Sequence, residues 1–420
     1  MRTGTDSFPP CEDRFVWHRR EDKKMHVERY PQLVTAMVWA SWFSMMLPRT
    51  VVTALLPTIE VEYQISHAEA GLLMTSYLYP YALMQIPAGA LSDRLGRKRF
   101  IIIALIGSSL ASFALAGRLG FLQMIGLRVM AGLFAGLWYA PSMSLLALSV
   151  GEKDRGKAVG LAFSGPPVSD TVIYLMVGML GVERFGWRNY FLIYAFPGLL
   201  CAFVTGLLVK EVAWPRHSSP PTIKKRQPVG KALKSRTMSG ILFHNVAVFL
   251  AMYGLRTFLP VYLVQVRGLA PSEASLLMVA YAASVIPSGP LIGYLVDRFG
   301  FGRPSLFSLV TLCLVVSALS VIPVGVPMVF FLLLWGLIGG WTVTAFSVLL
   351  TRIVPVETRG TFLGILNSST FLGAATGPLI LGYAADVGGF GAFFALASGM
   401  CLLAAAFAFP ILKAHWASKT

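Results

Sequence analysis

The stretch Gly89-Ala-Leu-Ser-Asp93-Arg94-Leu-Gly96-Arg97-Lys98 is a short charged loop that follows a long apolar run. A related stretch, Gly293-Tyr-Leu-Val-Asp297-Arg298-Phe-Gly300, follows another apolar run about half a chain later. A second pair of loops repeats at the same offset, with Arg155-Gly156 matching Arg359-Gly360. A parallel repeat of this length predicts two equivalent halves with substrate handled between them, which is a transporter architecture.

The composition excludes an ordinary soluble protein. The chain has 420 residues, of which 56% are hydrophobic and 13% are charged, whereas soluble proteins carry about 25% charged residues. The four cysteines are single and far apart, so neither a metal-binding CxxC spacing nor a disulfide framework is present. We therefore expect an integral membrane protein without a metal or another cofactor.

Twelve apolar runs are long enough to cross a bilayer, which requires ~20 mostly apolar residues in a helix. They cover approximately 33–59, 68–91, 100–117, 121–148, 158–182, 189–209, 239–265, 273–296, 305–324, 327–350, 361–384 and 391–412. The sequence predicts an all-α membrane protein with a basic amino-terminal segment (1–32), a six-helix half (33–209), a linker (210–238), a second six-helix half (239–412) and a short tail (413–420).

The basic residues are distributed unequally between the two sides of the membrane. Of 35 Lys and Arg, 28 lie in segments on the same side as the termini, and four lie on the opposite side. The positive-inside rule therefore predicts that both termini are cytoplasmic, in the cell membrane. This bias also explains the net charge of +16 without a nucleic-acid partner.

At Gly89 to Lys98 the sequence resembles the major facilitator superfamily, whose loop signature it matches at every constrained position. The resemblance extends over residues 33–412 and implies twelve helices in two pseudo-symmetric halves that transport a solute by alternating access. Arg128, followed by Gly132 and Gly136, is similar to the family's fourth-span pattern. Gly165-Pro166-Pro167 is similar to its antiporter motif, but Asp170 stands where that motif has a small residue.

The repeated loops are candidates for a conformational latch, whose contacts between helices would break when the two halves rock. Glycines allow a tight turn, an aspartate can accept hydrogen bonds from helix-end amides or a basic partner, and the basic residues hold one side of the membrane. The alternative is a plain positive-inside loop. The candidate latch residues are Gly89, Asp93, Arg94, Gly96, Arg97, Asp297 and Arg298.

Four ionisable residues lie deep inside predicted spans, where a charge costs several kcal/mol and therefore suggests a function. Arg49 and Arg256 lie at equal depth in the equivalent first and seventh spans. Because planar guanidinium groups suit carboxylate and phosphate oxygens, we expect these two residues and Arg128 to bind an anion. The alternative is that each arginine pairs with a nearby acid or extends toward the membrane surface. The fourth residue, Asp170, is the single deep acid and is predicted to carry a proton, or else to form a permanent ion pair with an arginine.

Further candidates have weaker support from helical spacing. Aromatic and amide side chains near these arginines are expected to line the substrate site, although such residues more often serve packing; they are Asn245, Tyr253, Tyr139, Tyr77 and Tyr281. His244 could titrate near neutral pH and join the proton pathway, or it could donate a packing hydrogen bond.

The HExxH, GxSxG and P-loop patterns are all absent, so we expect no enzymatic activity. The paired arginines resemble the organic-anion and organophosphate branches of the superfamily, including its anion:cation symporters. The predicted function is secondary active transport of a small anionic organic solute by a monomer, coupled to protons or to anion exchange. The alternatives are proton-coupled multidrug efflux and a membrane receptor or sensor that transports nothing.

Overall fold

The computed structural model describes residues 24–211, 235–300, 302–339 and 359–417, together with Trp341, Phe346, Leu349, Leu350 and Val354. Within these residues the chain forms α-helices joined by short connections, and no β-strand is present. The first half contains α1 (Lys24–Tyr63), α2 (His67–Leu95), α3 (Arg97–Ala114), α4 (Phe121–Gly136), α5 (Tyr139–Ser149), α6 (Glu152–Phe163), α7 (Gly165–Leu180), α8 (Val182–Phe185) and α9 (Trp187–Leu208). The second half contains α11 (Arg236–Gln265), α12 (Pro271–Phe299), α13 (Gly302–Leu319), α14 (Val326–Gly339) and α16 (Arg359–Ala417).

The helices correspond to the predicted spans, and two of the spans are interrupted. The fourth span is built from α4 and α5, and the fifth from α6 and α7, which begins at Gly165 with two prolines in its first turn. The last two spans form α16, which is broken at Gly388 and Gly389, where the backbone is not helical. The predicted all-α, two-half fold is confirmed, although most of the amino-terminal segment and of the linker lie outside the described residues.

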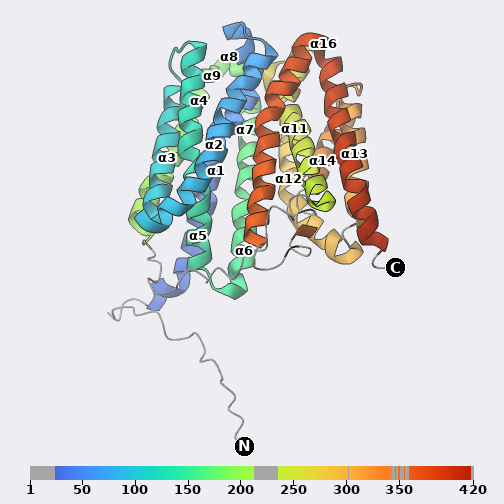
Figure 1. Ribbon diagram of the computed structural model, residues 1–420. Helices are drawn as coiled ribbons and strands as arrows, with labels where there is room; N and C mark the ends of the chain where they lie inside the picture. The colour runs from blue at the N-terminus through green and yellow to red at the C-terminus, as the bar shows by residue number, and fades with distance from the viewer. Residues whose placement is uncertain are drawn as a thin grey trace, which may run out of the picture.

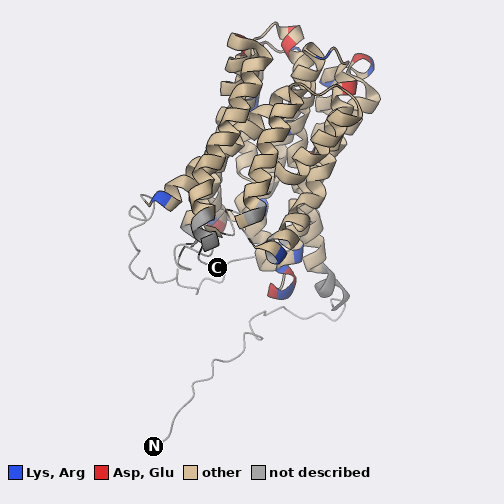
Figure 2. Cartoon of the chain, turned by 90° about the vertical axis from the view of Figure 1, so that its right-hand side faces the viewer, with Lys and Arg blue, Asp and Glu red and all other residues tan. Residues whose placement is uncertain are grey.

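The two halves stand side by side, with the first half at the left and the second at the right of Figure 1. Across the boundary α2 packs against α16, and α7 packs against α12. We call the lower end in Figure 1 the terminal face, because α9 ends and α11 begins there, and the upper end the distal face. Most charged residues gather at these two ends, and mainly uncharged residues occupy the length of the helices between them (Figure 2).

This arrangement suits a membrane. Within the described residues, five helical segments, among them Trp187–Leu208 and Arg236–Gln265, are individually long and apolar enough to cross a bilayer. Glycines allow the closest helix contacts: a Cβ added at Gly132 would lie 2.2 Å from the Tyr77 carbonyl oxygen, and one at Gly377 would lie 2.3 Å from that of Leu250. Small residues at such crossings are typical of helix packing in lipid, where burial of apolar surface gives no driving force.

Candidate functional site

An ion pair joins the two halves near the middle of the molecule. Arg256 on α11 contacts Asp170 on α7, with 2.7 Å between Nη2 and Oδ1. The Thr50 hydroxyl on α1 donates a hydrogen bond to the same Asp170 oxygen and accepts one from Arg256 Nη2 at 3.1 Å. Thr50 and Asp170 are both buried. Three helices from both halves therefore meet at one carboxylate.

The start of α7 explains how the Asp170 carboxylate comes to lie in the interior of the protein. Proline residues in the first turn of a helix have no N–H to leave unpaired, so Pro166 and Pro167 fit the helix start in the interior. Asp170 follows within the next turn and lies 8% exposed. The predicted deep position of Asp170 is thus observed, and its partner, Arg256, is one of the arginines expected to bind an anion.

Arg49 lies next to this ion pair and has a different environment. Its guanidinium carbon lies 5.0 Å from the centre of the Tyr253 ring, and its side chain is 8% exposed. No carboxylate contacts Arg49 among the residues that the structure describes. The guanidinium groups of Arg49 and Arg256 are close enough to repel each other electrostatically. We call Arg49, Thr50, Asp170 and Arg256 the charged cluster.

Arg128 is held in a way that differs from the other two buried arginines. Its Nε donates to the Leu73 carbonyl and its Nη1 to the Pro48 carbonyl, both at 3.2 Å. Its guanidinium carbon lies 4.6 Å from the centre of the Tyr77 ring, and the side chain is fully buried. Arg128 therefore fixes the backbone directly before Arg49, which favours a positioning role over the predicted contact with substrate.

Tyrosines surround the charged cluster. The hydroxyls of Tyr77 and Tyr174 are buried and have no hydrogen-bond partner among the described residues. Tyr281 interacts electrostatically with Arg256 and packs on Trp335, with ring centres 4.0 Å apart. Tyrosine hydroxyls without partners, next to guanidinium groups, supply hydrogen-bond donors that a bound anion can use.

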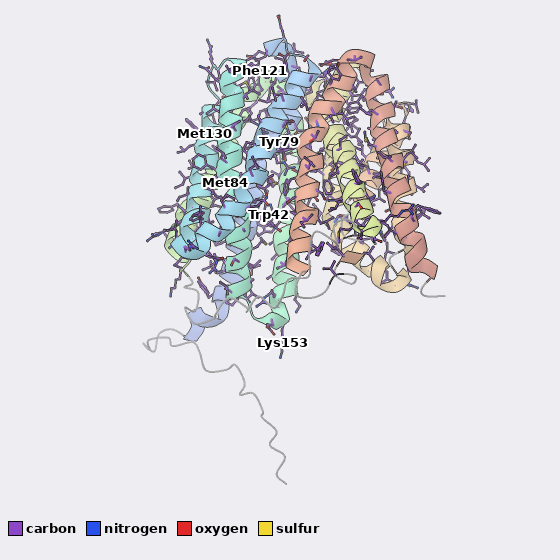
Figure 3. The ribbon with its side chains drawn as sticks, in the orientation of Figure 1. Trp42, Tyr79, Met84, Phe121, Met130 and Lys153 are labelled. Carbon is purple, nitrogen blue, oxygen red and sulfur yellow. The ribbon has the colours of Figure 1, made fainter. Side chains whose placement is uncertain are left out.

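Three other predicted residues have contacts of their own. Tyr139 packs edge-on against Trp42, with ring centres 5.6 Å apart; Trp42 lies closer to the terminal face than Tyr79 does (Figure 3). The Asn245 amide nitrogen lies within 3.0 Å of the Leu366 carbonyl and of two α16 hydroxyls. His244 donates to the Ala404 carbonyl at 2.9 Å. It precedes Arg256 by 12 residues, about 18 Å along the helix. The contacts of Asn245 and His244 match the packing alternative.

The latch candidates lie at the terminal face. Asp93 pairs with Arg97 at 2.6 Å, while Arg94 is exposed. Gly96 has a φ of +104°, a backbone conformation that favours glycine. A residue that sequence reasoning missed, Glu211, accepts hydrogen bonds from the backbone N–H groups of Arg97 and Lys98 at 2.7 and 3.1 Å.

The other latch candidates are less constrained. A Cβ added at Gly89 would make only an ordinary contact, at 3.5 Å, with Ala140. In the second copy, Arg298 donates to the Tyr294 hydroxyl at 2.6 Å, and the Asp297 side chain lies outside the described residues.

A second group of polar contacts, also missed from the sequence, joins the halves at the distal face. Asp386 on α16 accepts hydrogen bonds from the backbone N–H groups of His67 and Ala68 at 2.9 and 2.8 Å. Glu60 contacts the His67 ring at 3.2 Å and accepts a hydrogen bond from Gln265 at 2.9 Å. The hydrogen bond to Glu60 raises the pKa of His67, while burial raises the pKa of Glu60.

The sequence held signals for some of the missed residues. Thr50 directly follows Arg49, and Tyr174 lies one helical turn after Asp170. Asp386 and Glu211 act through contacts with segments far away in the chain, so no local pattern indicates them. The described residues contain no group of three His, Cys, Asp or Glu side chains that could hold a metal ion.

Two helical halves joined through buried charges, with closure contacts at one face, define a membrane transporter. Comparison with known proteins gives its family: the model of the Major Facilitator Superfamily matches residues 38–271 and 267–417. The chain belongs to the Major Facilitator Superfamily, as the loop signature predicted.

Individual relatives are distant but cover most of the chain. It is 26% identical to the cis,cis-muconate transport protein of Acinetobacter baylyi, over 81% of this chain and 84% of that protein. It is also 26% identical to the hexuronate transporter of Bacillus subtilis, over 85% of this chain and 89% of that transporter. A crystal structure of a bacterial homologue of the human lysosomal transporter Spinster has a TM-score of 0.78 to this chain and 20% sequence identity. The superposition covers 91% of this chain and 96% of the homologue.

Proposed function

We propose that this protein transports a small organic anion across the cell membrane by alternating access, in exchange for another anion or together with protons. The observation that carries the proposal is the Arg256–Asp170 ion pair next to Arg49, which has no acidic partner among the described residues. The relatives named as transporters of muconate and hexuronate, both organic acids, support the same substrate class.

The charges of the cluster favour an anion. With Asp170 ionised, Arg49, Arg256 and Asp170 sum to +1, and with Asp170 protonated they sum to +2. An unpaired charge in a low-dielectric interior is costly, so a substrate that neutralises it gains binding energy. The planar guanidinium groups and the tyrosine hydroxyls supply the donors that a carboxylate accepts.

Asp170 supplies a means of coupling. In the conformation described, its carboxylate occupies the position on Arg256 that a substrate carboxylate would take. A proton on Asp170 would weaken this ion pair and free Arg256 for substrate, so proton uptake and anion binding would favour each other. Exchange of one anion for another needs no change in the protonation of Asp170.

The contacts at the two faces fit alternating access. The distal face is closed by Asp386, Glu60 and Gln265, whose contacts cross between the halves, and these must break for the site to open there. At the terminal face, the loop at Asp93 and Arg97 forms the proposed latch. The excess of Lys and Arg on the terminal side supports a cytoplasmic terminal face.

Binding to the purified protein tests the anion assignment. We would measure thermal midpoints with a panel of monocarboxylates, dicarboxylates, sugar acids, sugar phosphates and cationic drugs, because a ligand of the folded state raises the midpoint. Arg49→Lys and Arg256→Lys keep the charge but lose the two-pronged geometry. Each should weaken anion binding about 10- to 150-fold, equivalent to the ~1.5–3 kcal/mol of a hydrogen bond to a charged group. Arg118→Lys, in an exposed loop, is the matched control.

Transport in vesicles tests the coupling. Asp170→Asn should abolish accumulation driven by a pH gradient but preserve exchange of internal for external anion, which also shows that the variant is folded. Asp154→Asn, an exposed acid on α6, should change neither. Accumulation that survives Asp170→Asn would remove Asp170 from the mechanism. If both lysine variants bind anions normally, or if only cationic drugs bind, multidrug efflux should replace the proposal.

A further inference from the structure

A groove of about 860 Å³ lies on the second half at the terminal face, far from the charged cluster. It runs between the first turns of α11 and the last turns of α16. Both helix ends lie at the terminal face in Figure 1. Gly240, a lining residue on α11, precedes Arg256 by 16 residues, or about 24 Å along the helix. The groove is therefore separate from the proposed transport site.

Tight contacts between the two helices fix the walls of the groove. A Cβ added at Gly240 would lie 3.0 Å from Ile411, so this glycine lets the helices approach. Phe243 and Phe407 stack at the side, with ring centres 5.4 Å apart and planes inclined by 19°. The hydrogen bond between His244 and the Ala404 carbonyl joins the helices beneath them. These contacts form a preshaped apolar channel.

One end of the groove is polar and basic. Arg236, Thr237 and Ser239, in the first turn of α11, contribute a guanidinium group and two hydroxyls to its lining. Ser235 caps this helix by accepting a hydrogen bond from the Met238 N–H, and the positive end of the helix dipole lies here. The lining residues include no Asp or Glu within the described part of the chain.

The apolar end faces the region that lipid would occupy. Phe243 and Phe407 are 59% and 37% exposed, and the other lining residues on α16 include Leu403 and Pro410. A guanidinium group at one end of an apolar channel, at the end of membrane-spanning helices, matches the chemistry of an anionic phospholipid.

We propose that this groove binds an anionic phospholipid from the leaflet at the terminal face. Its phosphate would accept hydrogen bonds from Arg236 and Thr237, and an acyl chain would lie along Phe243 and Phe407. Charge complementarity decides between lipids, because a zwitterionic headgroup carries its own cation and gains less from Arg236. The lipid composition of the membrane would then affect how α11 packs against α16.

The test uses the full chain in detergent with two probes, phosphatidylglycerol and phosphatidylcholine of identical acyl chains. Native mass spectrometry counts the retained lipids, and the thermal midpoint reports their effect on the folded protein. We expect phosphatidylglycerol to bind about fivefold or more tightly, the fold-change of one arginine contact near an anionic surface. Arg236→Gln should remove this preference, and Ala406→Trp, which fills the groove from an exposed lining position, should remove binding of both lipids there.

Arg155→Gln, at an exposed position of the terminal face on the first half, should behave like the wild type. The proposal is overturned if the wild type retains both lipids equally, or if Arg155→Gln loses the preference while Arg236→Gln keeps it. Glycerol phosphate that binds as well as the lipid would show a plain phosphate site instead. A lipid-independent dimer that Ala406→Trp disrupts would show that a second copy covers the groove.

Discussion

Removal of the Asp386 carboxylate should open the distal face. This side chain comes from α16 in the second half, yet it accepts the first two backbone N–H groups of α2 in the first half, at 2.9 and 2.8 Å. A helix N-terminus carries partial positive charge and N–H groups without helical partners, so a carboxylate there is favourable. Because the acceptor and the donors belong to different halves, these bonds exist only while the halves touch at the distal face.

The size of the effect follows from the contact. A hydrogen bond to a charged group contributes ~1.5–3 kcal/mol, but these two bonds are exposed, and solvent weakens them. We therefore take ~1–2 kcal/mol for Asp386→Ala, a factor of about 5–30 in the ratio of open to closed distal face. Asp386→Asn keeps one acceptor oxygen and loses the charge, so its shift should be smaller.

Spin-label distances across the distal face measure this ratio. Leu122 at the start of α4 and Val326 at the start of α14 are 82% and 84% exposed, and they belong to different halves. Labels at these positions, in a background without the native cysteines, should show more of the longer distance in Asp386→Ala. Glu273→Ala is the matched control, since Glu273 caps α12 within one half by accepting from the Ala270 N–H at 2.9 Å. A distance distribution unchanged by Asp386→Ala, or changed equally by Glu273→Ala, would refute the reasoning.

Three further outcomes are expected. Thr50→Val should reduce proton-driven accumulation severalfold because it removes the hydroxyl that orients Asp170, and Thr50→Ser should restore it. Asp93→Asn should slow transport in vesicles while anion binding in detergent changes little; an equal loss of both would indicate misfolding. The pKa of His67 is raised chiefly by its contact with Glu60 in the same half, and to a smaller extent by the charge of Asp386 in the other half, so only the Asp386 contribution depends on closure. This contribution of protonated His67 to closure is fully present below the ordinary histidine pKa and is lost as the pH rises through the raised value. In the same spin-label experiment, the open fraction should grow with pH in the wild type and change less in His67→Gln.

The fold was predictable because a bilayer restricts it strongly. Only helices or closed barrels span lipid, so runs of about twenty apolar residues fix the helix positions, and the repeated loops fix the order of the halves. Hydropathy could not show whether each span forms one unbroken helix. The breaks inside the fourth and fifth spans, after Gly136 and before Gly165, depend on local backbone conformation, which apolar content does not encode. The break at Gly388 and Gly389 falls between the predicted eleventh and twelfth spans.

The site was only partly predictable, for a related reason. Depth along a helix follows from counting residues, and this placed Arg49, Arg256 and Asp170 correctly in the interior. The direction of each side chain depends on helix rotation and packing, which one sequence does not give. Arg128 therefore looked equivalent to the other arginines, although its donors bind the Leu73 and Pro48 carbonyls.

The Arg256–Asp170 pair also bears on how an empty anion carrier can change conformation. Two guanidinium groups left bare in a low-dielectric interior are costly, so a carrier that has released its anion needs another negative group. In the proposed mechanism, Asp170 takes the place of the substrate on Arg256 and leaves one net positive charge for the next anion. The same carboxylate would then serve as a substitute for substrate and as the proton carrier. Coupling would arise because the proton and the anion each replace one partner of the same ion pair, the proton on Asp170 and the anion on Arg256, so each favours binding of the other. Asp170→Asn should therefore separate exchange from accumulation.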